Sequence, residues 1–408
     1  MLFKILLRFY CFVAITVQGI RIGPIIKDAL RRDVDGEDYK NNISYRDGYK
    51  IEDHDVTTKD GYILRLNRIS INVTENEGKN KLPPVYLFHG LLGNSENWLV
   101  SGPGRALAYL LYDAGYDVWL GNARGTTYSR RHRYLKPNQH EFWDFTWHEI
   151  GIYDNPANID YILKKTGKRQ IHYIGHSQGT TTFFVLTSLL PEYNDKIKTM
   201  HALAPVTFMK YTTSVYFTLP ALYIPTIYRF TTAFGFEEYF PNSLLFTSLQ
   251  NFCRSEDPDS NLCYKLLSIG GGENPKQIDT EILYKLYKYA PAGASIYQTL
   301  HYSQLYLNGE FQSFDYGEEG NLKRYKQKTP IKYPLEKVTA TPINLYVSGN
   351  DPISSLKDVK TLISKLPIKP NYIEIADKEW NHFDYIIGKQ AKELLYDTIL
   401  QSIISSDS

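Results

Sequence analysis

Short runs of apolar residues recur along most of the chain, and between them lie stretches in which apolar positions have helical spacing. Within each run nearly every side chain is apolar, which is typical of parallel strands buried on both faces. The runs lie at residues 85–88, 116–120, 171–174, 200–203, 343–347 and 372–375. Because strands alternate with helices, the pattern predicts an α/β fold with a mostly parallel central sheet covered by helices on both faces.

Two helices should flank the run at 171–174. Before it, Asn155 and Pro156 predict an N-cap followed by proline at the first helical position. After it, residues 180–190 are apolar enough for a buried helix. Pro191 should end that helix, because proline cannot continue the backbone hydrogen bonds.

The alternation of strands and helices also divides the chain into parts. Two β-prone runs, 54–58 and 62–66, flank an Asp-Gly pair and predict a hairpin before the main sheet. The alternation breaks off between 206 and 335, where Tyr, Phe, Leu and Pro are frequent and Gly270, Gly271 and Gly272 predict a flexible joint. An insertion of this kind predicts a mainly helical cap over the carboxyl edge of the sheet, where ligands bind in open α/β folds. The expected parts are a leader at 1–19, the core at 20–205 and 336–408, and the cap at 206–335.

The first 19 residues have the pattern of a secretory signal peptide. Lys4 and Arg8 are their only charged residues, and a short apolar run follows at 9–17. We expect cleavage after Gly19. An uncleaved membrane anchor is the alternative, but this run is shorter than the roughly 20 residues that a span requires. No later segment is long and apolar enough to span a membrane, so the mature chain should be secreted or lysosomal.

Removal of the leader lowers the formal net charge from +2 to 0, because both lost charges are positive. A neutral chain without a basic cluster argues against nucleic acid as a partner. Composition otherwise adds little: 43% hydrophobic and 22% charged residues are ordinary for a globular protein.

The cysteines and two asparagine triplets fit an oxidising compartment. Cys11 would leave with the leader, and Cys253 and Cys263 remain, ten residues apart. In a secreted chain such a pair predicts a local disulfide, with two free thiols as the alternative. Asn42 and Asn72 each begin an Asn-x-Ser/Thr triplet and are candidate glycosylation sites.

The strongest chemical signal is Ser177, the centre of Gly175-His176-Ser177-Gln178-Gly179. A Gly-x-Ser-x-Gly segment between a strand and a helix forms a sharp turn that exposes the serine as a nucleophile. Here the predicted strand at 171–174 precedes the motif and the predicted helix at 180–190 follows it. An ordinary serine in a strand–turn–helix joint is the alternative interpretation.

A serine hydroxyl needs a base, and the base needs an orienting acid. In this arrangement the partners follow the serine in the order acid, then histidine. Asp351 stands just after the predicted strand at 343–347. His382 follows the predicted strand at 372–375 and is the only histidine beyond Asp351. A turn aspartate before proline and a surface-loop histidine are the structural alternatives.

Acyl transfer also needs two backbone N–H groups that stabilise the oxyanion. Gln178, the residue after the nucleophile, supplies the first. The second should come from a loop after an earlier strand, and His89-Gly90-Leu91 follows the run at 85–88. We assign that donor to Leu91 and expect His89 to shape the loop rather than to act as a base.

With these residues in place, the sequence resembles the acid lipase family, which includes the gastric and lysosomal acid lipases. The resemblance covers about residues 45–400, and its matching segments are 55–64, 89–92, 97–98, 114–125, 128–130, 141–145, 175–181, 202–205, 291–295 and 381–384. It implies an α/β-hydrolase fold and hydrolysis of triacylglycerols or sterol esters at a lipid–water interface, through a cap with a mobile lid. It also implies a triad at Ser177, Asp351 and His382, a cap disulfide such as Cys253–Cys263, and no metal or cofactor.

Two other functions remain open at the level of the sequence. One is a different serine hydrolase on the same fold, such as a short-chain carboxylesterase or a peptidase. The other is a non-catalytic lipid carrier, although binding alone would need neither Ser177, Asp351 and His382 nor the loop of Leu91.

Overall fold

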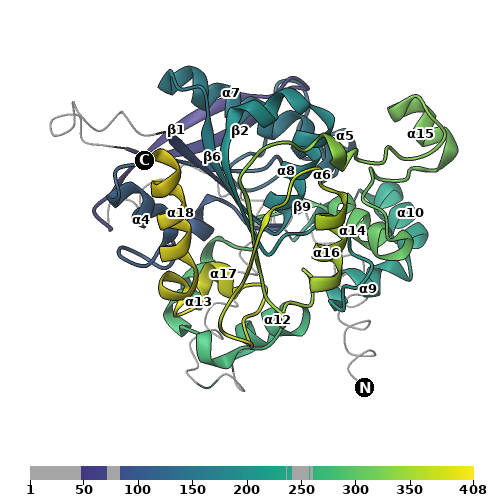
Figure 1. Cartoon of the computed structure of the whole chain (residues 1–408). Coiled ribbons are helices and arrows are strands. Elements are labelled where there is room, and N and C mark those ends of the chain that lie inside the picture. Colours follow the sequence, from purple (N-terminus) through teal and green to yellow (C-terminus); the bar gives the residue numbers. More distant parts are fainter. Residues whose placement is uncertain (1–46, 71–82, 236, 241–256, 258–260) are drawn as a thin grey trace, which may run out of the picture.

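The computed structural model describes residues 47–70, 83–235, 237–240, 257 and 261–408 (Figure 1). These residues form a sheet of nine strands in the order β1-β2-β4-β3-β6-β7-β10-β11, with β5 paired to β2 outside this path. The strands are β1 (Lys50–Thr57), β2 (Tyr62–Ser70), β3 (Pro84–Phe88), β4 (Asp117–Gly121), β5 (Arg131–His132), β6 (Ile171–His176), β7 (Ile197–Leu203), β10 (Ile343–Val347) and β11 (Asn371–Glu374).

The sheet is mostly parallel, as the apolar runs predict. Neighbouring strands from β4 to β11 pair in parallel, whereas β2 is antiparallel to β1, β4 and β5. Each of the six predicted runs overlaps a strand, and the predicted hairpin is the β1–β2 pair. The predicted α/β fold class is therefore confirmed.

Alternate side chains of each central strand enter two separate cores. Tyr86 and Phe88 of β3 point into the first, and Val85 and Leu87 into the second. The helices that pack on the first core are α7 (Asn155–Thr166), α8 (Gln178–Leu189) and α16 (Leu356–Lys365). Those that pack on the second are α4 (Leu107–Asp113), α17 (Asp384–Ile387) and α18 (Asp397–Asp407), as Figure 1 shows. Because both faces are covered, the central strands β3, β4, β6 and β10 are buried at almost every position and mostly apolar, whereas the edge strand β11 is largely exposed.

Helix α7 begins differently from the prediction. Asn155 is its first residue and not its N-cap, because the π-helical turn Ile150–Asp154 runs directly into it. The Asn155 side chain is buried instead, and its amide donates to the Tyr173 hydroxyl at 3.3 Å. Pro156 lies in the first turn as expected, and α8 ends just before Pro191. The N-cap prediction was wrong because the Asn155 side chain makes its hydrogen bond in the core and not at the start of the helix.

The stretch between β7 and β10 is mainly helical where the structure describes it. In Figure 1 helices α9, α10, α14 and α15 gather on the right-hand side, and α12 and α13 lie below the sheet. The elements of this stretch are α9 (Val215–Ala221), α10 (Ile224–Phe234), β8 (Glu238–Tyr239), α12 (Leu262–Gly271), α13 (Thr280–Tyr289), β9 (Ala294–Ser295), α14 (Ile296–Asn308) and α15 (Gly317–Tyr325). Its role as a cap, and the boundaries 206 and 335, remain predictions. Over the described part of the chain, no helix has the length and apolar character needed to cross a membrane.

The prediction that the three consecutive glycines form a flexible joint was wrong. Gly270 and Gly271 are the last residues of α12, and both are buried. A Cβ atom on Gly270 would lie 2.4 Å from the Tyr216 ring, and one on Gly271 would lie 2.2 Å from the Phe383 ring. From the sequence alone, a glycine that gives the backbone conformational freedom looks the same as one that lets another group pack closely against the backbone. Gly270 and Gly271 are of the second kind.

Candidate active site

Ser177 lies on the sharp turn between the end of β6 and the start of α8. Its φ of 52° is in the left-handed region, which is unusual for a residue with a side chain. Its backbone N–H donates to the Leu203 carbonyl at the end of β7, 2.9 Å away. The neighbouring strand therefore holds the strained turn that presents the hydroxyl, as observed at functional sites that store backbone strain.

The two glycines of the motif are required by contacts within the turn. A Cβ atom on Gly175 would lie 2.7 Å from the carbonyl carbon of Gly179. A Cβ atom on Gly179 would lie 2.2 Å from the Phe88 carbonyl oxygen on β3. Both distances are far below van der Waals contact, so only glycine lets the helix begin this close to the sheet.

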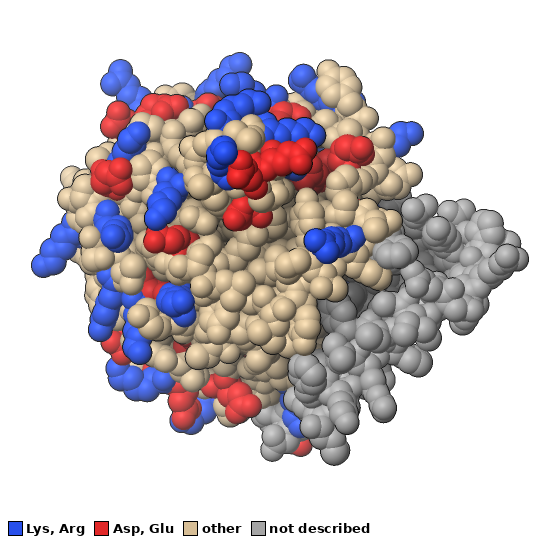
Figure 2. All heavy atoms as spheres, turned by 90° about the vertical axis from the view of Figure 1, so that its right-hand side faces the viewer, with Lys and Arg blue, Asp and Glu red and all other residues tan. Residues whose placement is uncertain are grey.

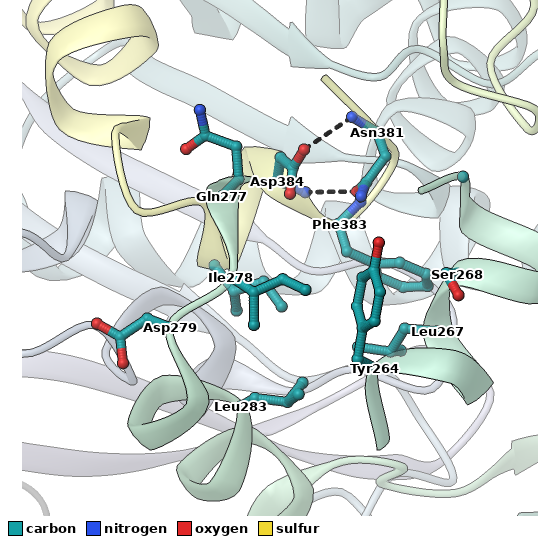
Figure 3. Close-up of a pocket in the computed structure, with 12 residues that line it drawn as sticks. Tyr264, Leu267, Ser268, Gln277, Ile278, Asp279, Leu283, Asn381, Phe383 and Asp384 are labelled. Atoms are coloured by element: carbon teal, nitrogen blue, oxygen red, sulfur yellow. Dashed lines mark hydrogen bonds between the residues drawn. The ribbon is translucent and has the colours of Figure 1, made fainter. Parts of the chain in front are cut away.

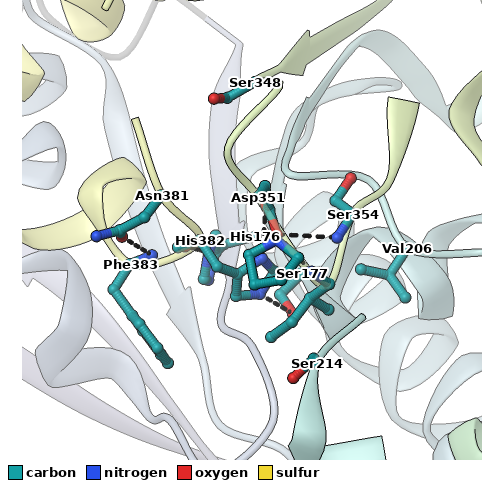
Figure 4. Close-up of polar contacts among 12 residues, drawn as sticks. His176, Ser177, Val206, Ser214, Ser348, Asp351, Ser354, Asn381, His382 and Phe383 are labelled. Carbon is teal, nitrogen blue, oxygen red and sulfur yellow. Dashed lines mark hydrogen bonds and ion pairs between the residues drawn. The ribbon is translucent and has the colours of Figure 1, made fainter. Parts of the chain in front are cut away.

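The three residues predicted as a triad are brought together although they are far apart in the sequence (Figure 4). The Ser177 Oγ lies 2.8 Å from His382 Nε2. The other ring nitrogen of that histidine, Nδ1, lies 2.8 Å from an Asp351 carboxylate oxygen. Ser177 is 9% exposed, His382 2% and Asp351 4%. This geometry allows the imidazole to accept the hydroxyl proton while its other N–H donates to the carboxylate.

Backbone groups fix the Asp351 carboxylate. The loop after β10 turns so that the second carboxylate oxygen accepts hydrogen bonds from the N–H groups of Ile353, at 2.8 Å, and Ser354, at 2.9 Å. Such bonds to a charged oxygen are stronger than bonds between neutral groups. They compensate the burial of the carboxylate and leave its other oxygen directed at His382.

His89 shapes the loop of the proposed second oxyanion donor. The N–H of Ala123 donates to His89 Nε2 at 3.0 Å, so Nε2 must be an acceptor and Nδ1 must carry the proton. Nδ1 then donates to the Gly90 carbonyl at 2.7 Å. Burial lowers the pKa of His89 to about 4, which favours this neutral form. Because C=O and N–H point in opposite directions across a trans peptide, holding the Gly90 carbonyl also sets the direction of the Leu91 N–H.

The predicted oxyanion residues lie on adjoining segments. A Cβ atom on Gly90 would lie 3.1 Å from the Ser177 Cβ, so the Leu91 loop packs against the elbow. Within the part of the chain that the structure describes, neither the Leu91 nor the Gln178 backbone N–H donates a hydrogen bond. The Gln178 side chain donates to the Gln298 side chain of α14 at 2.7 Å. Both N–H groups are thus available to an oxygen beside Ser177, and their role remains a prediction.

His176 is a site residue that the sequence did not single out. Its Nε2 donates to the backbone carbonyl of His382 at 3.0 Å, and the two rings lie 5.0 Å apart. Burial and then the nearby His382 lower the pKa of His176 to about 3, so the ring is neutral. Its partner is a backbone carbonyl far along the chain, and nothing in the local pattern marks such a contact.

The other predicted sites are described only in part. Cys263 is buried and disulfide-bonded, and Cys253 lies outside the described residues, as do Asn42 and Asn72. Among the residues with described positions, no group of three or more His, Cys, Asp or Glu side chains could hold a metal ion.

Two family models match the chain. Residues 83–389 match the model described as alpha/beta hydrolase fold. Residues 41–102 match the model described as partial alpha/beta-hydrolase lipase region. The first match spans the strands from β3 to β11 and all three residues of the predicted triad.

Full-length relatives are similar over most of the chain. Lipase 3 of Drosophila melanogaster is 40% identical over 88% of this chain and 91% of its own length. The human gastric triacylglycerol lipase is 39% identical over 88% of this chain and 89% of its own. A Crotalus adamanteus protein, provisionally named lysosomal acid lipase/cholesteryl ester hydrolase, is 35% identical over 95% of this chain and 96% of its own.

Solved structures are similar in fold at low sequence identity. A Sulfolobus solfataricus protein, provisionally named a lipase, aligns with a TM-score of 0.55 at 15% identity. The alignment covers 88% of this chain and 99% of that one.

Proposed function

The chain belongs to the acid lipase family of α/β-hydrolases, which makes it a carboxylic ester hydrolase, and from this premise we propose that it cleaves lipid esters through an acyl-enzyme at Ser177. The observation that carries the proposal is the hydrogen-bonded chain from Ser177 through His382 to Asp351. A protein that only binds lipid would need no such chain, because binding requires no proton transfer.

In the proposed first step His382 Nε2 takes the Ser177 hydroxyl proton as Oγ attacks the ester carbonyl carbon. The carbonyl oxygen becomes an oxyanion, to which the Leu91 and Gln178 N–H groups donate. As the tetrahedral intermediate collapses, His382 returns the proton to the alkoxide, and the alcohol leaves. Asp351 keeps Nδ1 protonated and stabilises the imidazolium.

The second step releases the acid. His382 removes a proton from water while the water oxygen attacks the acyl carbon of the ester to Ser177. A second oxyanion forms at the same two N–H groups and collapses. The Ser177 Oγ takes the proton from His382, and the fatty acid leaves. The residues that act in this step are the same, so no further protein group is required.

Relatives and surface both support a lipid substrate. The relatives are named for triacylglycerol and cholesteryl esters. Helices α9 and α10 expose large apolar side chains, and the short link between them exposes Leu222 at 65% and Tyr223 at 45%. Figure 2 shows this side of the molecule, where a broad uncharged area lies below a band of charged side chains. Exposed apolar surface of this kind is typical of sites that meet other molecules or lipid.

We further propose that the chain is secreted or lysosomal, as the names of its gastric and lysosomal relatives suggest. Cleavage after Gly19, glycans on Asn42 and Asn72, and a Cys253–Cys263 disulfide belong to the same proposal. N-terminal sequencing and intact mass of the secreted protein, before and after deglycosylation and reduction, would test each part separately.

The test of the substrate class is a panel of triacylglycerols, sterol esters, phospholipids and short-chain esters, assayed between about pH 4 and pH 8. This window brackets the titration of an ordinary histidine. We expect hydrolysis of emulsified long-chain esters that is lost in Ser177→Ala. Preference for short soluble esters, with no response to an emulsion, would make the protein a carboxylesterase instead.

A further inference from the structure

The loops that carry Asp351 and His382 are both attached to one short segment from outside the sheet. This segment, residues 271–274, connects the end of α12 with the 3-10 turn Pro275–Gln277 and is called the strap below. It lies in the stretch between β7 and β10, and its contacts with the two loops are separate from those that the elbow makes. Figure 3 shows a small pocket beside this segment, lined by Asn381, Phe383 and Asp384 of the His382 loop together with residues of α12 and α13.

The strap binds the backbone of His382 directly. The His382 N–H donates to the Gly271 carbonyl at 2.9 Å. At its other end, the His382 carbonyl accepts from His176 Nε2 at 3.0 Å. Both backbone polar groups of the histidine are therefore held, one by the strap and one by the elbow. A backbone held in this way can move toward or away from Ser177 only if one of these bonds breaks.

The strap also binds the loop of Asp351. The Asn350 side chain donates to the Glu273 carbonyl at 2.9 Å and to the Glu379 carbonyl at 2.6 Å. Gly272, with a φ of +95°, packs against the same loop, where a Cβ atom would lie 2.7 Å from the Asn350 carbonyl oxygen. The acid loop, the strap and the histidine loop thus form one hydrogen-bonded unit.

Asn274 is the side chain that completes the attachment. It is fully buried, and its amide donates to Asp384 at 2.9 Å and to Asp377 at 3.1 Å. The same Asp384 oxygen accepts the Asn381 N–H at 2.9 Å. The Asn381 side chain in turn accepts from the N–H groups of Phe383, at 2.8 Å, and Asp384, at 3.0 Å. His382 is therefore enclosed in a ring of hydrogen bonds that Asn274 fastens to the strap.

We propose that the strap is a positioning element of the active site, and that Asn274 holds His382, through Asp384 and Asn381, in register with Asp351 and Ser177. This role rests on the function proposed above. The residues that hold the triad in place would then include a short segment of the stretch between β7 and β10. Any movement of that stretch that admits substrate must therefore leave residues 271–274 in place.

The test compares Asn274→Ala and Asn350→Ala with Lys276→Ala. Lys276 is a matched control, because it also links the segment after the strap to the histidine loop, through an ion pair with Glu379 at 2.8 Å. Unlike Asn274, its side chain is 72% exposed, so the ion pair should contribute little to holding the loop. Each variant is titrated with a fluorophosphonate to count active sites. The kcat and KM for a soluble ester, and the rate of phosphonylation of Ser177, are then measured well below the melting temperature.

We expect kcat per titrated site to fall about 10- to 100-fold in Asn274→Ala, with KM unchanged, because small displacements of catalytic groups have effects of this size. The phosphonylation rate should fall by a similar factor, and Lys276→Ala should match the wild type. A purely structural role would lower the melting temperature and leave kcat per site within about twofold of the wild type, which would overturn the proposal.

If Asn274→Ala does not fold, Asn350→Ala decides the question alone, since Asn350 is only half-buried and should tolerate the change. A wild-type protein that neither reacts with the probe nor hydrolyses esters would refute the proposed function itself. That outcome differs from an active wild type whose variants show unchanged kcat per site, which would refute only the role of the strap.

Discussion

Replacing Asp384 with asparagine should change how the stability of the protein depends on pH. Burial raises the pKa of this carboxyl group from 3.8 to about 7, even though Asn381 and Asn274 donate hydrogen bonds to it. A carboxyl group with a raised pKa in the folded state stabilises the fold when it is protonated. Its contribution is fully present below pH 3.8 and is lost as the pH rises through about 7. The asparagine side chain cannot titrate, so the Asp384→Asn variant lacks this dependence.

The magnitude follows from the shift in pKa. Each unit corresponds to about 1.4 kcal/mol, so the difference in unfolding free energy between variant and wild type should change by roughly 4 kcal/mol between about pH 4 and pH 8. The variant gains relative stability as the pH rises. The buried histidines titrate in both proteins, and their contributions cancel in the difference.

The assay is urea unfolding of both proteins at intervals from about pH 4 to pH 8. Glu319→Gln, which removes an exposed carboxylate on α15, serves as the control and should follow the wild-type curve. A difference between Asp384→Asn and wild type that stays constant within about 1 kcal/mol over this range would refute the assignment of a raised pKa.

Three further substitutions, two of them paired with a control substitution, test the oxyanion loop and the elbow. Leu91→Pro, which removes the N–H, should lower kcat about 100- to 1000-fold, whereas Leu91→Ala should retain most activity against the same soluble ester. His89→Ala frees the Gly90 carbonyl and should lower kcat about tenfold with little change in KM; equal kcat values would contradict the role given to this histidine. Gly179→Ala places a Cβ atom 2.2 Å from the Phe88 carbonyl oxygen and should cost about 3 kcal/mol or more in urea unfolding. Gly349→Ala, whose Cβ would meet nothing closer than 3.9 Å, should unfold like the wild type.

Much of the fold could be predicted because the relevant signals are local. Most positions of the central strands are apolar, and burial on both faces favours that pattern directly. The order Ser177, Asp351, His382 could be predicted in the same way, since each residue follows a predicted strand. The structure places His382 within hydrogen-bond distance of both Ser177 and Asp351, and the catalytic roles of the three residues stay predictions.

The support of the site could not be predicted, because it depends on contacts between distant segments. Asn274 and Asp384 are 110 residues apart, and neither belongs to a motif that indicates the other. The glycines before Asn274 predict a flexible joint, yet in the structure the rings of Tyr216 and Phe383 pack against Gly270 and Gly271. Asn155 has the sequence context of an N-cap, yet its side chain is used in the core. In each case tertiary contacts override a local preference.

The most direct test of the central claim is reaction of the folded protein with a fluorophosphonate, followed by peptide mapping in a mass spectrometer. We expect a single adduct on Ser177, loss of ester hydrolysis in proportion to labelling, and no adduct in Ser177→Ala or in the unfolded chain. A folded wild-type protein that binds lipid but remains unlabelled would contradict the claim and would identify the chain as a lipid carrier.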